Sequence, residues 1–149
     1  MNTSVQTPAY KILFLEDNFL DVLLMTRELK KAGIGYVERK VIHREDFISS
    51  LTEFRPDLII SDYSLPSFNG MEAFHIFKAY NIAIPFLLVS GSMREEDTQK
   101  CLSEGVDCFL QKSDFHQLPA VMTRALEAKK LEREKVDFGF KAGGNIAYA

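Results

Sequence analysis

The sequence lacks the marks of several large protein classes. It has no Trp, and its two cysteines, Cys101 and Cys108, are too few for a disulfide framework or a structural zinc site. None of its apolar runs approaches the roughly 20 residues that cross a bilayer. Residues 1–8 are polar and lack the basic start and apolar centre of a signal peptide. We therefore expect a cytoplasmic protein in a reducing compartment, with no membrane association.

An excess of positive charge is also absent. The chain has 149 residues, of which 18 are Lys or Arg and 21 are Asp or Glu, giving a formal net charge of −3. This balance predicts no direct binding of nucleic acid. No glycine-rich phosphate loop is present, which argues against a nucleotide as a ligand. The length suits one folded domain with a sizeable core.

Short apolar runs of strand length recur along the chain. Residues 10–15, 58–61 and 86–89 are almost continuously apolar, and each run ends at a polar residue. Residues 37–42 and 108–110 are weaker strand candidates. Runs of this kind are typical of parallel strands that are buried on both faces of a sheet.

Helical spacing of apolar residues fills the gaps between these strands. A first helix is expected between Asn18, a plausible N-cap, and Gly33. The other expected helices cover residues 44–54, 71–80, 95–104 and 118–135. The alternating order predicts an α/β fold with a doubly wound, five-stranded parallel sheet. The flavodoxin-like (βα)5 arrangement, with strand order 2-1-3-4-5, fits best.

Polar residues stand where each of the main strands ends. Glu16 and Asp17 follow the first strand, Asp62 ends the third, Ser90 ends the fourth and Lys112 follows the fifth. In a doubly wound sheet, functional residues gather beyond the carboxyl ends of the strands. These five side chains are therefore expected to share one crevice.

The expected crevice combines three carboxylates with one lysine. Neighbouring carboxylates repel one another unless a cation neutralises them, and Mg²⁺ suits a site with one or two direct carboxylate ligands. Lys112 could meet an anionic oxygen, and Ser90 adds a hydroxyl donor. A carboxylate can also form a covalent acyl phosphate, which makes Asp62 the candidate nucleophile for phosphoryl transfer.

The same segments resemble the receiver domain of two-component response regulators. The similarity rests on FLEDN at 14–18, DLIISDYSLPSFNGMEAF at 57–74, FLLVSGS at 86–92 and GVDCFLQKSD at 105–114. It covers roughly residues 10–129. On this basis residues 1–9 are an N-terminal leader, 10–129 the receiver domain, and 130–149 a charged helix end followed by a loose tail.

The resemblance implies a role for each acidic residue. Asp62 matches the phosphoacceptor, which takes a phosphoryl group from the phosphohistidine of a histidine kinase. Asp17 matches a direct Mg²⁺ ligand and Glu16 one that usually acts through water. The backbone carbonyl of Ser64 would complete the metal site.

Three further residues match the family's switch and binding positions. Ser90 resembles the switch hydroxyl, Lys112 the lysine that contacts the phosphoryl group, and Phe109 the switch aromatic. Two positions depart from the family. Ser113 stands where proline commonly follows the lysine, often through a cis bond, so the isomer of the Lys112–Ser113 bond stays open. Phe109 replaces a frequent tyrosine, so any switch would act through packing alone.

The resemblance also implies partners. These are a histidine kinase or histidine phosphotransfer protein upstream and, downstream, an output protein or domain or a second copy in a homodimer. Such a module is not an enzyme beyond its own phosphorylation and slow dephosphorylation. Two alternatives stay open: an aspartyl-phosphate hydrolase on a related sheet, and an interaction module or flavodoxin without this chemistry.

The end of the chain changes character. Residues 127–135 are strongly charged, which is typical of a solvated final helix or of a helix that leads to an output domain. Residues 136–149 show no helical or strand period, so a loose end is expected there.

Overall fold

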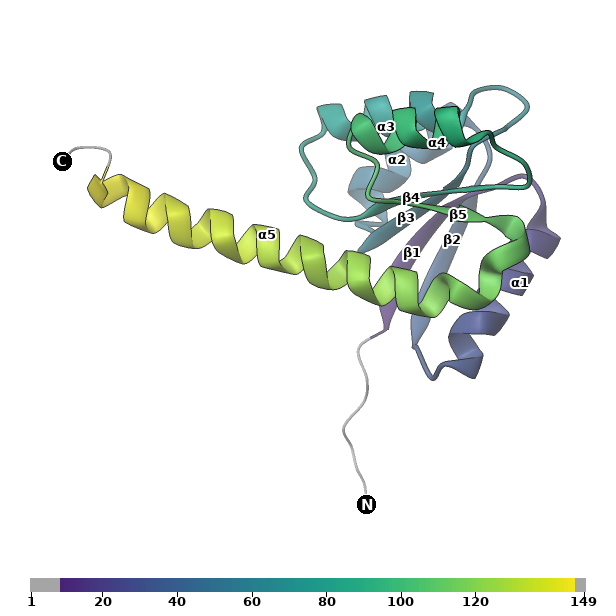
Figure 1. Cartoon of the computed structure of the whole chain (residues 1–149), viewed down its shortest axis with the longest axis horizontal. Coiled ribbons are helices and arrows are strands. Elements are labelled where there is room, and N and C mark those ends of the chain that lie inside the picture. The colour runs from purple at the N-terminus through teal and green to yellow at the C-terminus, as the bar shows by residue number, and fades with distance from the viewer. Residues whose placement is uncertain (1–8, 147–149) are drawn as a thin grey trace, which may run out of the picture.

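The core of the molecule is one parallel sheet. The computed structural model describes residues 9–146, with side chains up to residue 136. Its five strands are β1 (Tyr10–Leu15), β2 (Tyr36–Val41), β3 (Leu58–Asp62), β4 (Phe86–Ser90) and β5 (Cys108–Gln111). All pairings are parallel and the order is β2-β1-β3-β4-β5. Figure 1 labels the five strands. The predicted fold and strand order are confirmed.

A helix follows every strand. The helices are α1 (Phe19–Lys31), α2 (Arg44–Glu53), α3 (Gly70–Ala79), α4 (Glu95–Ser103) and α5 (Leu118–Ile146). Asn18 caps α1, because its side chain accepts a hydrogen bond from the amide of Leu20 at 3.0 Å. Asn69 and Glu72 form a capping box that starts α3. These caps place the helix starts beside the strand ends, where the predicted site lies.

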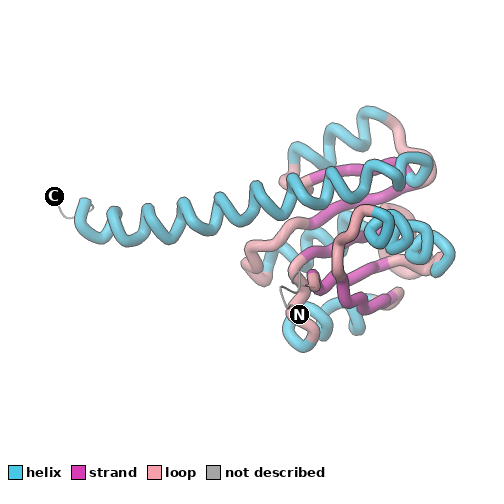
Figure 2. The backbone as a smooth tube through the Cα atoms, turned by 90° about the horizontal axis from the view of Figure 1, so that it is seen from below, coloured by secondary structure: helices cyan, strands magenta, loops and turns pink. Residues whose placement is uncertain are grey.

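The sheet separates two apolar cores. One core lies between the sheet and helices α1 and α5, and the other lies between the sheet and helices α2, α3 and α4. Figure 2 shows the strands running between these two helical layers. Every residue of β3 and β4 is buried. Phe74 and Phe86 meet edge to face in the second core, with ring centroids 5.2 Å apart.

The last helix is longer than the sequence predicts. The expected loose end after residue 136 is wrong as far as Ile146, because α5 continues to that residue and extends beyond the sheet (Figures 1 and 2). Packing of Leu118, Val121 and Met122 nucleates α5 on the domain. Adding residues to an existing helix costs far less than starting one, so the helix continues past its last buried turn. Residues 1–8 of the expected leader and 147–149 of the expected tail lie outside the described residues.

The connection after β5 is a short 3-10 helix, η1 (Lys112–Gln117), which the sequence did not indicate. All peptide bonds of the described residues are trans, including the one between Lys112 and Ser113. None of the described helices combines the length and the apolar character needed to span a bilayer.

Candidate functional site

Four strand ends meet at one crevice. Glu16 and Asp17 follow β1, Asp62 ends β3, Ser90 ends β4 and Lys112 follows β5. The crevice lies beside the adjacent strands β1 and β3, whose helices α1 and α3 cover opposite faces of the sheet. This is the switch point at which open α/β sheets place their functional residues. The structure therefore brings together the acidic residues and the lysine that the sequence singles out.

The three predicted acidic ligands are close enough to share one ion. Glu16, Asp17 and Asp62 each offer a carboxylate oxygen, and these oxygens lie within 4.8 Å of one another. Glu16 and Asp62 are buried, whereas Asp17 is exposed. Mg²⁺ takes oxygen ligands and usually keeps several waters, so a group of carboxylates with one side open to solvent suits it. The role of the Ser64 backbone carbonyl as a metal ligand stays a prediction. The amide of the same residue donates a hydrogen bond to Asp62 Oδ1 at 3.2 Å.

The carboxylate of Glu16 is buried, and its charge is only partly compensated by its neighbours. Its side chain is 1% exposed. Burial and the nearby charge of Asp62 raise its pKa to about 7, although the Asn18 amide and Lys112 act in the other direction. Lys112 Nζ lies 3.0 Å from Glu16 Oε1, but Oε1 has no aligned hydrogen bond. A buried and only partly compensated oxygen of this kind fits a metal site.

Lys112 is the positive centre of the crevice. Its Nζ lies 2.7 Å from Asp21 Oδ2, 3.0 Å from Glu16 Oε1 and 3.2 Å from Asp62 Oδ2. Burial disfavours the ammonium, but the hydrogen bond to Asp21, the close contact with Glu16 and the charges of Glu16 and Asp62 outweigh this effect. The pKa of Lys112 therefore lies above its usual value, and the side chain stays charged.

Sequence reasoning missed Asp21. It lies in the first turn of α1, four residues after Asp17. The helix starts directly after Glu16 and Asp17, so an acidic residue in its first turn lies near their end of the sheet, and this placement is the signal that could have found it.

It also missed Gly70. A Cβ at Gly70 would lie 2.6 Å from the backbone oxygen of Asp62 and 2.6 Å from Leu88 Cδ2. Only glycine therefore lets α3 start so close to the end of β3. The amide of Gly70 also donates to the carbonyl of Tyr63 at 2.9 Å, which closes the loop after Asp62.

The predicted switch residues lie on adjoining strands. Ser90 is buried at the end of β4 and pairs in register with Gln111 of β5. Phe109 is half-buried and packs on the sheet face that α4 covers. Gly91 leaves open space beside Ser90, because a Cβ there would meet nothing within 4 Å. The positions suit a switch, and its operation stays a prediction.

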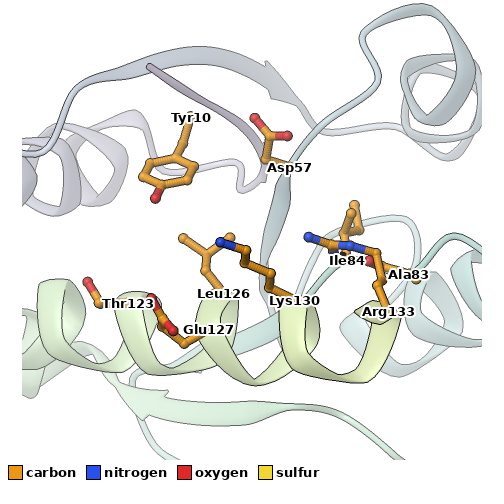
Figure 3. A pocket seen from close by; sticks show the side chains of 9 residues that line it. All are labelled: Tyr10, Asp57, Ala83, Ile84, Thr123, Leu126, Glu127, Lys130 and Arg133. Carbon is orange, nitrogen blue, oxygen red and sulfur yellow. Dashed lines mark hydrogen bonds between the residues drawn. The ribbon is translucent and has the colours of Figure 1, made fainter. Parts of the chain in front are cut away.

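A separate cavity of about 440 Å³ lies at the opposite end of the sheet. Tyr10 begins β1, and Asp57 and Ile84 precede β3 and β4, so these lining residues mark the amino ends of the strands. Figure 3 shows Lys130 and Arg133 reaching from α5 into this cavity. None of the crevice residues lines it.

Comparison with known proteins agrees with this geometry. The family described as "Response regulator receiver domain" matches residues 12–123. The chain belongs to this family. It is therefore a receiver domain of two-component signal transduction, and the resemblance of the sequence motifs is confirmed.

Several curated relatives are similar to this chain over part of their length. The receiver is 28% identical over 137 residues to histidine kinase CKI1 of Arabidopsis thaliana, covering 80% of this chain and 12% of the kinase. It is 24% identical to the response regulator ARR15 of the same plant, covering 90% of this chain and 72% of ARR15. It is 25% identical to the transcription factor SKN7 of Saccharomyces cerevisiae, covering 78% of this chain but 19% of SKN7. The chain thus spans a small part of CKI1 and SKN7.

Solved structures share the fold. The signal receiver domain of a LuxO repressor protein from Vibrio parahaemolyticus superposes with a TM-score of 0.74 at 20% identity, covering 85% of this chain and 96% of that domain. The receiver domain of the sensor histidine kinase PA1611 from Pseudomonas aeruginosa gives 0.68 at 23% identity, covering 80% and 99%. That domain holds a magnesium ion in its active-site cleft.

Proposed function

We propose that this receiver accepts a phosphoryl group on Asp62, with Mg²⁺, and thereby switches the face formed by α4 and β5. The observation that supports this most is the convergence of Lys112 Nζ on Asp62 Oδ2 at 3.2 Å beside the acidic group of Glu16, Asp17 and Asp62. The magnesium ion in the cleft of the PA1611 receiver supports the choice of metal. Mg²⁺ bound by these carboxylates would neutralise charge that develops on the transferred phosphoryl oxygens.

In the proposed step, a carboxylate oxygen of Asp62 forms a bond to phosphorus. The bond from phosphorus to the donor histidine nitrogen breaks, and its electron pair stays on the imidazole ring. Lys112 holds its ammonium beside the reacting carboxylate, where it stabilises negative charge on the phosphoryl oxygens. The amide of Ser64 fixes the Asp62 carboxylate through Oδ1.

The proposed switch runs from Ser90 to Phe109. The Ser90 hydroxyl would turn toward the phosphoryl group, and Phe109, half-buried against the α4 side of the sheet, would follow into the space it leaves. Such a change would shift an existing equilibrium between two packings of the same fold. The α4 and β5 face is then the surface on which an output protein, an output domain or a second copy would act.

A phosphohistidine donor must cover the crevice to reach Asp62. The start of α1, directly beside the crevice, exposes large apolar side chains: Phe19, Leu20, Leu23 and Leu24. Exposed apolar patches of this kind mark protein-interaction surfaces. We propose that a histidine kinase or histidine phosphotransfer protein, acting in the cytoplasm, docks here. The receiver itself would catalyse only its own phosphorylation and slow dephosphorylation.

Acetyl phosphate, a small phosphoryl donor, tests the proposal. With Mg²⁺, intact-mass spectrometry should detect one added phosphoryl group, absent after chelation and absent in Asp62→Asn. The matched control is Asp46→Asn, an exposed aspartate in the first turn of α2, which should label like the wild type. Equal labelling of Asp62→Asn would contradict the proposal. Rapid multiple turnover with release of inorganic phosphate would favour the hydrolase alternative instead.

A further inference from the structure

We propose that Asp21 is a positioning residue that holds the Lys112 ammonium in the crevice during phosphoryl transfer, an inference that rests on the proposed function. Asp21 Oδ2 accepts a hydrogen bond from Lys112 Nζ at 2.7 Å. This is the shortest of the three contacts of Lys112, compared with 3.0 Å to Glu16 and 3.2 Å to Asp62. Asp21 therefore makes the closest approach to the ammonium, although it lies outside the acidic group around Asp62.

Asp21 is held more firmly than the lysine it contacts. It lies in the first turn of α1, where its amide donates to the carbonyl of Asn18 at 3.0 Å. The neighbouring Val22 and Met25 are buried in the core and fix the rotation of the helix. Lys112, by contrast, has four rotatable side-chain bonds and begins the short helix η1. A rigid carboxylate can thus orient a flexible ammonium.

The charges of the crevice explain why a separate partner is needed. Glu16 and Asp62 belong to the group of carboxylates that can share a metal ion, whereas Asp21 does not. If those carboxylates held a divalent cation, their charge would be neutralised and Lys112 would lose their attraction. Once Asp62 carries an acyl phosphate, its own carboxylate charge is gone as well. Asp21 then remains as the carboxylate that keeps Lys112 beside the phosphoryl oxygens.

A competing role for Asp21 would change the rate of phosphorylation in the opposite direction. If Asp21 only competed with the phosphoryl group for the ammonium, its removal would free Lys112 and speed phosphorylation. If Asp21 positions Lys112, its removal slows phosphorylation, and the loss disappears when Lys112 is absent. This dependence on Lys112 separates positioning from a general effect on the fold or on the metal.

A double-mutant cycle measures this dependence. The rate of labelling by acetyl phosphate with saturating Mg²⁺ is compared among wild type, Asp21→Ala, Lys112→Met and the double variant. We expect Asp21→Ala to slow labelling about tenfold in the wild-type background and to change it less than twofold beside Lys112→Met. Asp21→Asn, which keeps an oxygen acceptor without its charge, should fall between wild type and Asp21→Ala. Faster labelling of Asp21→Ala, or equal losses in both backgrounds, would overturn the proposal.

The matched control is Asp46→Ala, which removes an acidic residue from the first turn of α2 in the same way. It should label at the wild-type rate, so that a loss of helix-terminus charge alone is ruled out. The thermal midpoints of Asp21→Ala and Asp46→Ala should both stay close to that of wild type.

A second readout does not need phosphorylation. In Mg²⁺-free protein, the ammonium ¹H–¹⁵N signal of Lys112, assigned by its loss in Lys112→Met, should be protected from solvent exchange. Asp21→Ala should lose this protection, and Asp46→Ala should keep it. Protection that survives in Asp21→Ala would refute the positioning role. If wild type is not labelled at all, the proposed function fails, whereas this signal still decides whether Asp21 holds Lys112.

Discussion

Asp107 and Lys129 connect the loop before β5 to α5 through an ion pair, with Asp107 Oδ1 3.0 Å from Lys129 Nζ. The second oxygen of Asp107 accepts a hydrogen bond from the amide of Phe86 at 2.8 Å. The amide of Asp107 donates to the carbonyl of Phe86 at 3.1 Å in return. One aspartate thus joins β4, β5 and α5 at the amino edge of the sheet.

Asp107→Ala should destabilise the domain more than Asp57→Ala. Asp57 makes the same reciprocal pair with Lys11 on β1, with contacts of 2.8 and 2.7 Å, but in an exposed setting. Loss of Asp107 leaves the amide of the fully buried Phe86 without its partner, which costs about 1–3 kcal/mol. Water can replace Asp57 at Lys11, so we expect less than about 1 kcal/mol there. Urea unfolding of the two variants decides, and equal losses would contradict this account.

Stability should respond to Lys129 at alkaline pH. Burial disfavours the ammonium of Lys129, but Asp107 and Glu132 outweigh this effect and raise its pKa above 10.5 in the folded state. A raised pKa stabilises the fold fully below the unfolded value, and this contribution is lost as pH rises through the folded value. The free-energy difference between wild type and Lys129→Met, about 1 kcal/mol near neutral pH, should hold up to about pH 10 and shrink as the pH rises further. Lys100→Met, at an exposed position on α4, should show a constant difference.

The sequence predicts the strands and the fold of this molecule better than the length of its last helix. Apolar strands that are buried on both faces have an unmistakable pattern, and β1 begins and ends at the expected residues. The residues at the strand ends then fall at one edge, because parallel topology requires it. The loose end expected after residue 136 is wrong, because local composition does not report that a helix nucleated on the domain continues past it.

Asp21 and Gly70 depend on contacts between distant parts of the chain, which sequence patterns do not predict. Asp21 matters through Lys112, which lies 91 residues away. Gly70 matters because a Cβ there would collide with the backbone of Asp62 and the side chain of Leu88. Both relationships depend on the rotation and position of a helix against the sheet, and these are set by packing across the whole domain.

Gly70→Ala should therefore harm both stability and the crevice. The new methyl group would lie 2.6 Å from the carbonyl oxygen of Asp62, a backbone atom that cannot turn aside. We expect a loss of about 1–3 kcal/mol in the free energy of unfolding, as for other overpacked sites, together with slower labelling of Asp62. Gly91→Ala is the control, since a Cβ there meets nothing within 4 Å and its stability should change by less than about 0.5 kcal/mol. A stable Gly70→Ala variant would mean that α3 can move away from β3 without cost.

Magnesium should stabilise the receiver. Glu16→Gln should show that the Glu16 carboxylate destabilises the metal-free protein but contributes to Mg²⁺ binding. Glu16 is 1% exposed and lies beside the charge of Asp62, so its carboxylate weakens the metal-free fold. Removing the charge should leave the metal-free protein at least as stable as wild type. At a Mg²⁺ concentration 100 times the dissociation constant, wild type should gain about 2.7 kcal/mol, and Glu16→Gln should gain much less. Thermal unfolding with Mg²⁺ and with a chelator measures both quantities. An equal Mg²⁺ gain in the two proteins would exclude Glu16 from the metal site and leave Asp17 and Asp62 as its carboxylate ligands.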